Sequence, residues 1–215
     1  TPTLGLATID RNPLAELEAH PDKDGNALDL GGQPATAWIT ALADAVAVIT
    51  AALPALGAEL ALTLRRVVPV GYDRERHLSC SYREAPGLVY LSLHPDGLTL
   101  AEAIVHETQH GKLHLLSWLD PLLDNPPTER VASPARPDPR PLMGVLLAAH
   151  ALVPVAALHH ALAAIDHPWA APPNRRQQIL AGNAEALATL AAHARPTALG
   201  AKVIAALVDL HAQLS

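Results

Sequence analysis

One segment, residues 101–118 with the sequence AEAIVHETQHGKLHLLSW, constrains the fold more than any other part of the chain. It surrounds the pattern HETQH, residues 106–110, with apolar residues and good helix formers, and this predicts a mostly buried helix. Residues four apart share one face of a helix and lie about 6 Å apart along its axis. His106 and His110 can therefore direct two imidazoles at one point, as a single zinc or iron ion requires. Glu107 lies beside that point as a base, an orienting group or a ligand.

The HExxH pattern by itself leaves two interpretations open. It is short, and the chain contains 12 histidines, so such a pair can also arise by chance. Two histidines on an apolar helix can equally be core residues bonded to backbone carbonyls. A metal site needs further donors, which have to come from elsewhere in the chain.

Composition excludes several classes of protein. The chain has 215 residues, of which 50% are hydrophobic and 17% charged, so we expect one compact domain spanning residues 1–215. A net charge of -6 and a pI near 6.0 argue against nucleic-acid binding. No apolar run reaches the ~20 residues of a membrane span without a proline or a charge. Cys80 is the only cysteine, so no internal disulfide can form, and we expect a cytoplasmic protein in which Cys80 serves packing.

The first third of the chain predicts an arm followed by helices. Residues 1–32 contain the turn-rich run HPDKDGN, and we expect them to form an irregular N-terminal arm. Apolar residues adopt helical spacing from about Pro34 onward. Pro54 should end or kink that helix before a second helix that runs to about Ala61.

A strand-like region comes next and leads directly into the HExxH helix. Three segments are rich in β-branched residues or alternate between apolar and polar residues, namely 64–70, 77–82 and 87–93, and they predict a small antiparallel sheet. Pro69 suggests that the first of these strands is an edge strand or ends there. Thr99, with Glu102 three residues later, is the expected N-cap of the HExxH helix.

The second half of the chain predicts a long loop and a bundle of helices. Residues 120–141 are rich in proline and have no periodicity, and a loop this long is often functional. Three further helices are expected, over 142–165 with a bend at Pro154, over 174–193 and over 198–214. The predicted fold class is therefore mainly α with a small antiparallel sheet (α+β), in which the sheet leads into the HExxH helix and a helical bundle follows.

Three residues are candidates for a third metal ligand. His114 lies two helical turns, about 12 Å of rise, from His106, so one small ion cannot easily bind both. Glu129 has the spacing used by gluzincin peptidases, but it sits in NPPTER, where two prolines argue against the required helix. His150 is the better candidate, because it lies within an apolar helix where an unpaired imidazole would be costly. A core histidine bonded to a carbonyl is the alternative for His150.

Two segments, LSCSYREAPGLVYLSLHPDGLTLAEAIVHETQHGKLHLL and SPARPDPRPLMGVLLAAHALVPVA, resemble the HExxH-motif peptide-modification proteins. Members of this family are α-ketoglutarate-dependent HExxH-type peptide β-hydroxylases. The upstream phrases HPDKDGNALDLGG and VVPVGY fit the same family, so the resemblance covers nearly the whole chain. HExxH together with the downstream SPxRxDPRP phrase is considerably more specific than HExxH alone.

The resemblance implies a 2-oxoglutarate-dependent oxygenase with Fe(II) bound by His106, His110 and His150. It also implies 2-oxoglutarate and O2 as co-substrates, and hydroxylation at the β-carbon of a residue in a ribosomally synthesised precursor peptide. The distal carboxylate of 2-oxoglutarate suits a planar bidentate arginine, for which Arg140 is the first candidate and Arg136 the second. The edge of a strand such as 87–93 could take up an extended peptide.

Two other functions remain open. A zinc metallopeptidase would use His106, Glu107 and His110 with either Glu129 or His150, and Glu107 would then be the general base for water. An oxygenase needs no such base, so there Glu107 would orient His110 or another ligand, or bind the metal itself. The third possibility is a non-catalytic helical binding protein whose histidines are structural.

Overall fold

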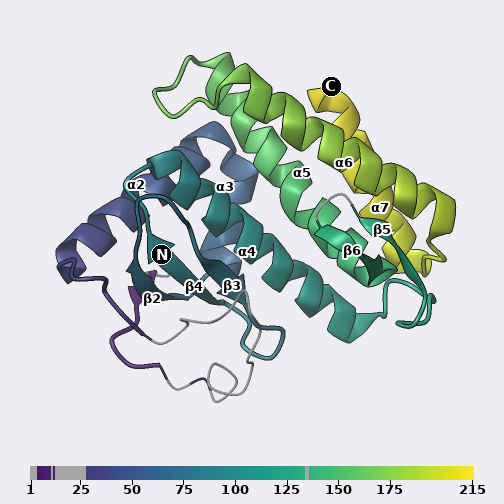
Figure 1. Ribbon diagram of the computed structural model, residues 1–215, viewed down its shortest axis with the longest axis horizontal. Coiled ribbons are helices and arrows are strands. Elements are labelled where there is room, and N and C mark those ends of the chain that lie inside the picture. The colour runs from purple at the N-terminus through teal and green to yellow at the C-terminus, as the bar shows by residue number, and fades with distance from the viewer. Residues whose placement is uncertain (1–3, 11, 13–27, 134–135) are drawn as a thin grey trace. The chain divides into compact units, whose positions relative to one another are not determined.

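The computed structural model describes residues 4–10, 12, 28–133 and 136–215. The chain divides into two compact units, Thr1–Gly111 and Lys112–Ser215. Helices predominate, with a four-stranded sheet and a separate two-stranded sheet, so the predicted α+β class is confirmed (Figure 1). The expectation of a single domain over 1–215 stays a prediction.

The sheet of the first unit is mixed, not antiparallel as predicted. Its strands are β1 (Gly5–Leu6), β2 (Arg66–Tyr72), β3 (Ser79–Ser81) and β4 (Leu88–Leu93), in the order β1-β2-β4-β3. β2 is parallel to both β1 and β4, and only β3 and β4 form an antiparallel pair. The antiparallel pairing was visible in the sequence because β3 and β4 are joined by a short turn. The parallel pairs depend on long crossover connections, which leave no local signal.

The N-terminal arm, predicted to be irregular, contains a short strand and a bridge to the sheet where it is described. Residues 5 and 6 form β1 beside β2, and Asp29 makes an isolated bridge to Val70. The Tyr90 hydroxyl donates a hydrogen bond of 2.9 Å to Asp10 Oδ2, which ties the arm to the central strand β4. Residues 13–27 of the predicted arm lie outside the described residues.

Two helices connect β1 to β2, as the apolar spacing predicted. α2 (Ala35–Ala52) buries a stripe of side chains one turn apart, consisting of Trp38, Leu42, Ala45 and Ile49. α3 (Pro54–Thr63) begins at Pro54, where the missing N–H costs nothing. Gly57 allows the two helices to pack closely, because a Cβ there would lie 2.6 Å from Thr50 Oγ1.

The strand β2 pairs on both sides and continues to Tyr72, so the prediction that Pro69 marks an edge strand or the end of the strand is wrong. Proline is tolerated at position 69 because the outer side of β2 is covered by two short partners, β1 and the Asp29 bridge, with a gap between them. On the outer side of β2, Val67 O accepts a hydrogen bond from Ala7, and Pro69 O accepts one from Asp29. The Pro69 nitrogen falls between these contacts, where the ladder needs no donor.

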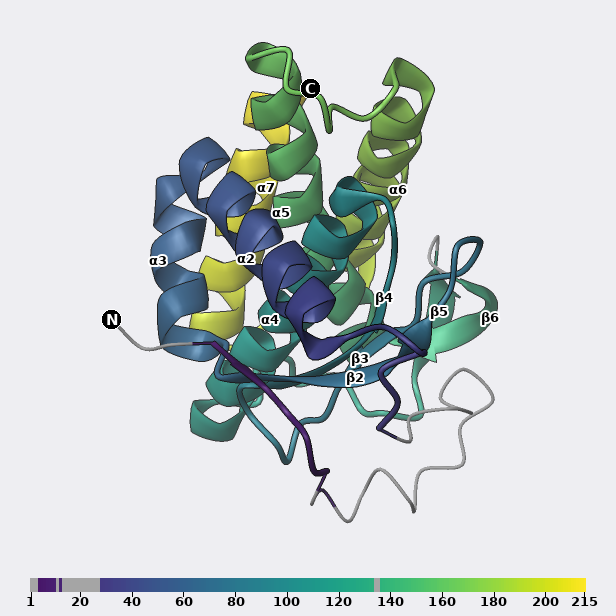
Figure 2. The same cartoon turned by 90° about the vertical axis from the view of Figure 1, so that its left-hand side faces the viewer.

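α4 (Gly97–Leu119) contains the HExxH pattern and follows directly from β4, as predicted. Asp96, and not Thr99, caps it, because Asp96 carboxylate oxygens accept hydrogen bonds from the backbone N–H groups of Leu98 and Thr99. Partial burial works to raise the pKa of Asp96, but the hydrogen bonds from Thr99 and Leu98 bring it below its ordinary value. Figure 2 shows α2 and the first half of α4 on one face of the sheet.

The proline-rich segment of the second unit contains a hairpin that the sequence reasoning missed. β5 (Arg130–Ser133) and β6 (Arg136–Pro141) pair in antiparallel fashion. The β6 sequence RPDPRP places proline at every second residue. Backbone N–H groups point alternately to the two sides of a strand. The proline nitrogens, which carry no hydrogen, therefore all face one edge, and the N–H groups of the other residues can donate to β5 on the opposite edge.

Three long helices complete the second unit, close to their predicted positions. They are α5 (Leu142–Ala164), α6 (Pro173–His193) and α7 (Ala198–Leu214), and they run side by side in Figures 1 and 2. Their core combines apolar side chains of all three helices with Leu122 and Leu123 of the preceding loop. Thr197 caps α7 by accepting a hydrogen bond from the Gly200 N–H.

Among the described residues, α2 and α5 are long and apolar enough to cross a membrane by length and composition alone. The apolar 18-residue window of α5 is 67% buried and that of α2 is 22% buried. α2 packs its apolar stripe inside the first unit and exposes mainly alanine and threonine. Two such helices are by themselves weak evidence for a membrane span, because a buried core helix passes the same test.

Candidate functional site

The HExxH residues point in three directions around α4. Each residue advances about 100° around a helix, so His106 and His110 share one face. Glu107 lies to one side of that face and contacts β3. Gln109 lies to the other side and donates a hydrogen bond of 3.2 Å to Glu59 of α3. The two flanking contacts fix the rotation of the helix about its axis, and with it the direction of the histidine face.

The structure brings the His106 and His110 rings together. Their centroids lie 4.3 Å apart and the ring planes are 83° apart, and both side chains are partly exposed. Two imidazole nitrogens bound to one ion at about 2.0–2.1 Å lie roughly 3 Å from each other. With their centroids 4.3 Å apart, the two rings lie close enough to be candidates for two of the donors that a metal ion needs. Metal binding by the pair stays a prediction.

Glu107 is held by two serines that the sequence reasoning missed. Its side chain is only 4% exposed. Ser79 Oγ donates to Oε1 and Ser81 Oγ donates to Oε2, each at 2.7 Å. Both serines lie on β3, where alternate side chains share one face, while the intervening Cys80 is buried in the cluster on the opposite face. We call Ser79, Ser81 and Glu107 the serine–carboxylate clamp.

The clamp fixes what Glu107 can do. Each carboxylate oxygen already accepts a short hydrogen bond inside the protein. Both donors are neutral hydroxyls, so they orient the carboxylate without cancelling its charge. A general base for water needs an oxygen that water can reach. A buried carboxylate that accepts two hydrogen bonds from the protein is better suited to an orienting and electrostatic role. The negative charge beside the histidine face favours a cation there.

A second histidine pair lies in the same unit. The rings of His77 and His94 are 6.3 Å apart and nearly perpendicular. His77 Nδ1 lies 3.3 Å from Ser92 Oγ, and its Nε2 is buried without a hydrogen-bond partner among the described residues. Burial, and next the nearby His94, lower the pKa of His77 to about 4, although Glu102 opposes the shift. His77 is therefore a neutral imidazole near pH 7.

The remaining predicted site residues belong to the second unit. His150 is buried on α5, with 6% of its surface exposed. Arg140 is the penultimate residue of β6 and pairs with Val131. Its side chain lies beside the first turn of α5, since a Cβ on Gly144 would be 3.7 Å from Arg140 Cβ and 3.8 Å from its Cδ. Arg136 opens β6, and its side chain lies outside the described part of the structure.

Arg140 has the property expected of an arginine that binds an anion. Its Nε is buried and has no hydrogen-bond partner within the described residues. A buried guanidinium donor without an acceptor costs about 1–3 kcal/mol, and a carboxylate would satisfy it. Arg130 supports the strand from the partner side by donating a hydrogen bond of 3.2 Å to the Pro139 carbonyl.

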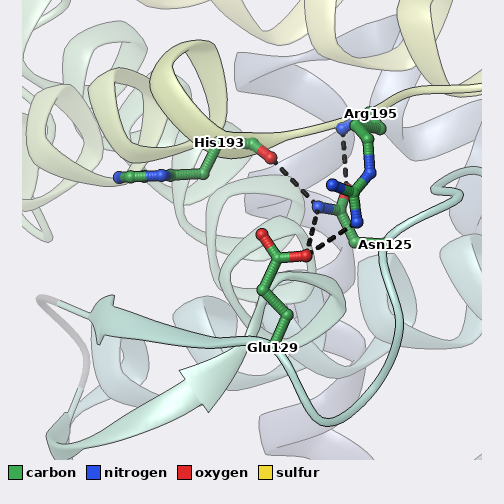
Figure 3. A network of polar contacts seen from close by, with 4 residues as sticks. All are labelled: Asn125, Glu129, His193 and Arg195. Atoms are coloured by element: carbon green, nitrogen blue, oxygen red, sulfur yellow. Dashed lines mark hydrogen bonds and ion pairs between the residues drawn. The ribbon is translucent and has the colours of Figure 1, made fainter.

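Glu129, the alternative peptidase ligand, has structural partners. Its Oε2 forms an ion pair of 2.8 Å with Arg195 and accepts a hydrogen bond of 3.2 Å from Asn125 (Figure 3). Asn125 also donates to the His193 carbonyl and accepts from the Arg195 N–H. The network ties the loop after α4 to the connection between α6 and α7. Glu129 precedes β5 and is not helical, in agreement with the two prolines before it.

The part of the chain that the structure describes contains no group of three His, Cys, Asp or Glu side chains placed to hold a metal ion. Of the proposed ligands, His106 and His110 belong to the first unit and His150 to the second. No protein-family model matches the chain, and no curated protein matches it.

Proposed function

We propose that this chain is an Fe(II)- and 2-oxoglutarate-dependent oxygenase that hydroxylates the β-carbon of a residue in a ribosomally synthesised precursor peptide. The family resemblance motivates the proposal, and the serine–carboxylate clamp is the observation that supports it over the alternative. A zinc metallopeptidase needs a glutamate that can take a proton from water. Both Glu107 oxygens instead accept hydrogen bonds of 2.7 Å from the Ser79 and Ser81 hydroxyls. This arrangement suits an enzyme that requires no general base.

In this proposal His106 and His110 bind the iron, with His150 as the third ligand. The three protein donors would leave positions for the keto acid and O2. When bound, iron and 2-oxoglutarate supply the oxidising chemistry that converts a C–H bond of the peptide to C–OH. Glu107 acts from outside the ligand set: it keeps a negative charge next to the histidine face and so favours the divalent ion.

Arg140 binds the distal carboxylate of 2-oxoglutarate in this proposal. Its buried, unpartnered Nε is the donor that a carboxylate would complete, and the guanidinium plane offers two parallel N–H groups. Arg140 lies between Pro139 and Pro141, which stiffen the backbone on both sides of it, so little backbone entropy is lost on binding. Arg136 remains the second candidate.

The peptide substrate is better placed at β3 than at the strand 87–93. That strand is β4, which pairs on both sides, while β3 is at the end of the sheet order. Leu78 O accepts a hydrogen bond from Ser92 of β4, so by alternation the backbone groups of Ser79 and Ser81 point away from β4. An extended peptide that pairs with them would lie beside Glu107. We also propose a cytoplasmic location, where a precursor peptide is synthesised.

Anaerobic spectroscopy tests the proposal without knowledge of the peptide. We expect the full chain to bind Fe(II) and, after addition of 2-oxoglutarate, to develop the visible metal-to-ligand charge-transfer band of this co-substrate. His106→Ala and His110→Ala should each abolish the band. His114→Ala is the matched control, because it removes a histidine from the next turn of the same helix and should leave the band intact. Zinc-dependent cleavage of a generic peptide, with no band, would instead favour the peptidase.

Two further variants separate the roles within the site. Arg140→Ala should weaken 2-oxoglutarate binding about ten-fold or more, through loss of a charge-assisted pair, while iron binding is kept. His150→Ala should lower iron occupancy. Full occupancy in this variant would mean that His150 is not the third ligand. An unchanged 2-oxoglutarate affinity in Arg140→Ala would mean that another residue binds the distal carboxylate.

A further inference from the structure

The second unit contains a small cavity that the proposed oxygenase chemistry does not use. It lies where late α5, the start of α6 and the end of α7 meet, and it has a volume of about 140 Å³. Its lining includes His159 and His160 of α5, Arg176 and Gln177 of α6, and Leu214 of α7. A drug-sized ligand needs about 300 Å³ or more, whereas a water molecule occupies about 30 Å³. The cavity can therefore hold one small polyatomic ligand with a few waters.

The polar groups of this cavity are suited to negative charge. Its lining contains a guanidinium, two imidazoles and an amide, and no carboxylate. Arg176 Nε is buried and has no hydrogen-bond partner among the described residues. A buried guanidinium donor in this state is stabilised by an anionic oxygen more than by any neutral acceptor.

The helix ends near the cavity do not decide the sign of its field. α6 begins at Pro173, which brings the positive end of a helix dipole, while α7 ends at Leu214 and brings a negative end. Each end is equivalent to roughly half a charge, so the two largely cancel. The full charge of the Arg176 guanidinium then determines which ligands bind.

We propose that this cavity binds a small oxoanion of the size of inorganic phosphate. The Arg176 guanidinium contacts two of its oxygens in a forked arrangement, Gln177 contributes an amide donor, and His160 faces it from α5. This site is separate from the proposed 2-oxoglutarate contact at Arg140 and needs neither iron nor peptide.

Calorimetric titration with inorganic phosphate tests the proposal, using the full chain in chloride buffer at constant ionic strength. We expect saturable binding of one phosphate per chain. Arg176→Gln should weaken it about ten-fold or more, because at least one charge-assisted hydrogen bond is lost. Arg175→Gln is the matched control: it removes the same charge from the adjacent, exposed residue outside the lining and should change the affinity less than about two-fold.

Two results would overturn the proposal. One is the absence of saturable phosphate binding by the unaltered chain, and the other is an equal loss of affinity in Arg175→Gln and Arg176→Gln, which would indicate general charge attraction. Should Arg176→Gln fail to fold, Arg176→Lys carries the test, since it keeps the charge but not the planar fork. We expect it to bind phosphate about five-fold more weakly, and an affinity equal to that of the unaltered chain would count against the site.

Discussion

The two units surround their candidate glutamates very differently. Glu107 of the first unit is 4% exposed and accepts hydrogen bonds from two neutral hydroxyls. Glu129 of the second unit pairs with Arg195, and the two side chains are 34% and 58% exposed. The first arrangement orients a negative charge and preserves it, while the second cancels the charge at the surface. Only the first leaves a carboxylate whose charge can act on a neighbouring cation, and only the first is costly to disturb.

The largest expected effect follows from removing the donors of the clamp. In Ser79→Ala/Ser81→Ala the buried Glu107 carboxylate loses both hydrogen bonds, and we expect the free energy of unfolding to fall by about 3 kcal/mol. Adding Glu107→Met should recover most of this loss, because an apolar side chain of similar length needs no donor. Urea denaturation of the double and triple variants measures both changes. A triple variant no more stable than the double would show that the clamp is not what stabilises this contact.

Acid should destabilise the first unit through His77. Its pKa is lowered to about 4 in the folded protein, first by burial and then by His94, from 6.5 in the unfolded chain. Between these values the unfolded chain binds more protons, so stability falls as the pH drops through 6.5 and levels off below 4. From pH 7 to pH 5 this loss amounts to about 2 kcal/mol.

His77→Gln tests this pH dependence, because glutamine cannot titrate. Denaturation at pH 7 and pH 5 should show a smaller acid loss in the variant than in the unaltered chain, by about 2 kcal/mol. Equal losses in both proteins would mean that His77 is accessible to protons in the folded state. His94→Gln, at the partly exposed partner ring, should reproduce only a minor part of the difference.

The elements that could be predicted from the sequence are those specified by neighbours in the chain. The helical spacing around Trp38, the break at Pro54 and the approach of His106 to His110 all depend on residues within a few positions. The hairpin of β3 and β4 is also local. These predictions hold in the folded protein because the apolar residues of each helix or strand recur with the period of that element and so form its buried face.

The features that escaped prediction arise from contacts between distant residues. Ser79 is 28 residues from Glu107, and nothing in the SCSY sequence indicates that a helix will present a carboxylate to it. The parallel pairing of β2 with β4 depends in the same way on the chain path between them. The N-cap moved from Thr99 to Asp96 because the helix begins at Gly97, one turn earlier than its apolar spacing suggests. Local spacing cannot specify such partners.

A smaller effect distinguishes the two glutamates by charge alone. Glu107→Gln keeps the shape of the side chain, and one serine hydroxyl can turn to accept from the new amide, so we expect a loss of about 1 kcal/mol in the free energy of unfolding. Divalent metal affinity, measured by competition with a chelating dye, should fall about ten-fold, as is typical for a carboxylate outside the ligand set. Glu129→Gln serves as the control and should leave metal affinity unchanged. Equal metal affinities in Glu107→Gln and Glu129→Gln would show that the Glu107 charge does not contribute to metal binding.

The smallest expected effect concerns the surface pair. Glu129→Gln should lower the free energy of unfolding by less than about 1 kcal/mol, because an exposed ion pair gains little over its hydration. Asn125 still donates to the side chain at position 129 in this variant, so the loop stays attached to Arg195 through the remaining hydrogen bonds. Raising the salt concentration to about 1 M shortens the screening length to about 3 Å, and the difference between variant and unaltered chain should then vanish in urea denaturation. A loss of several kcal/mol that resists salt would place Glu129 in the same class as Glu107 and remove the contrast between the two units.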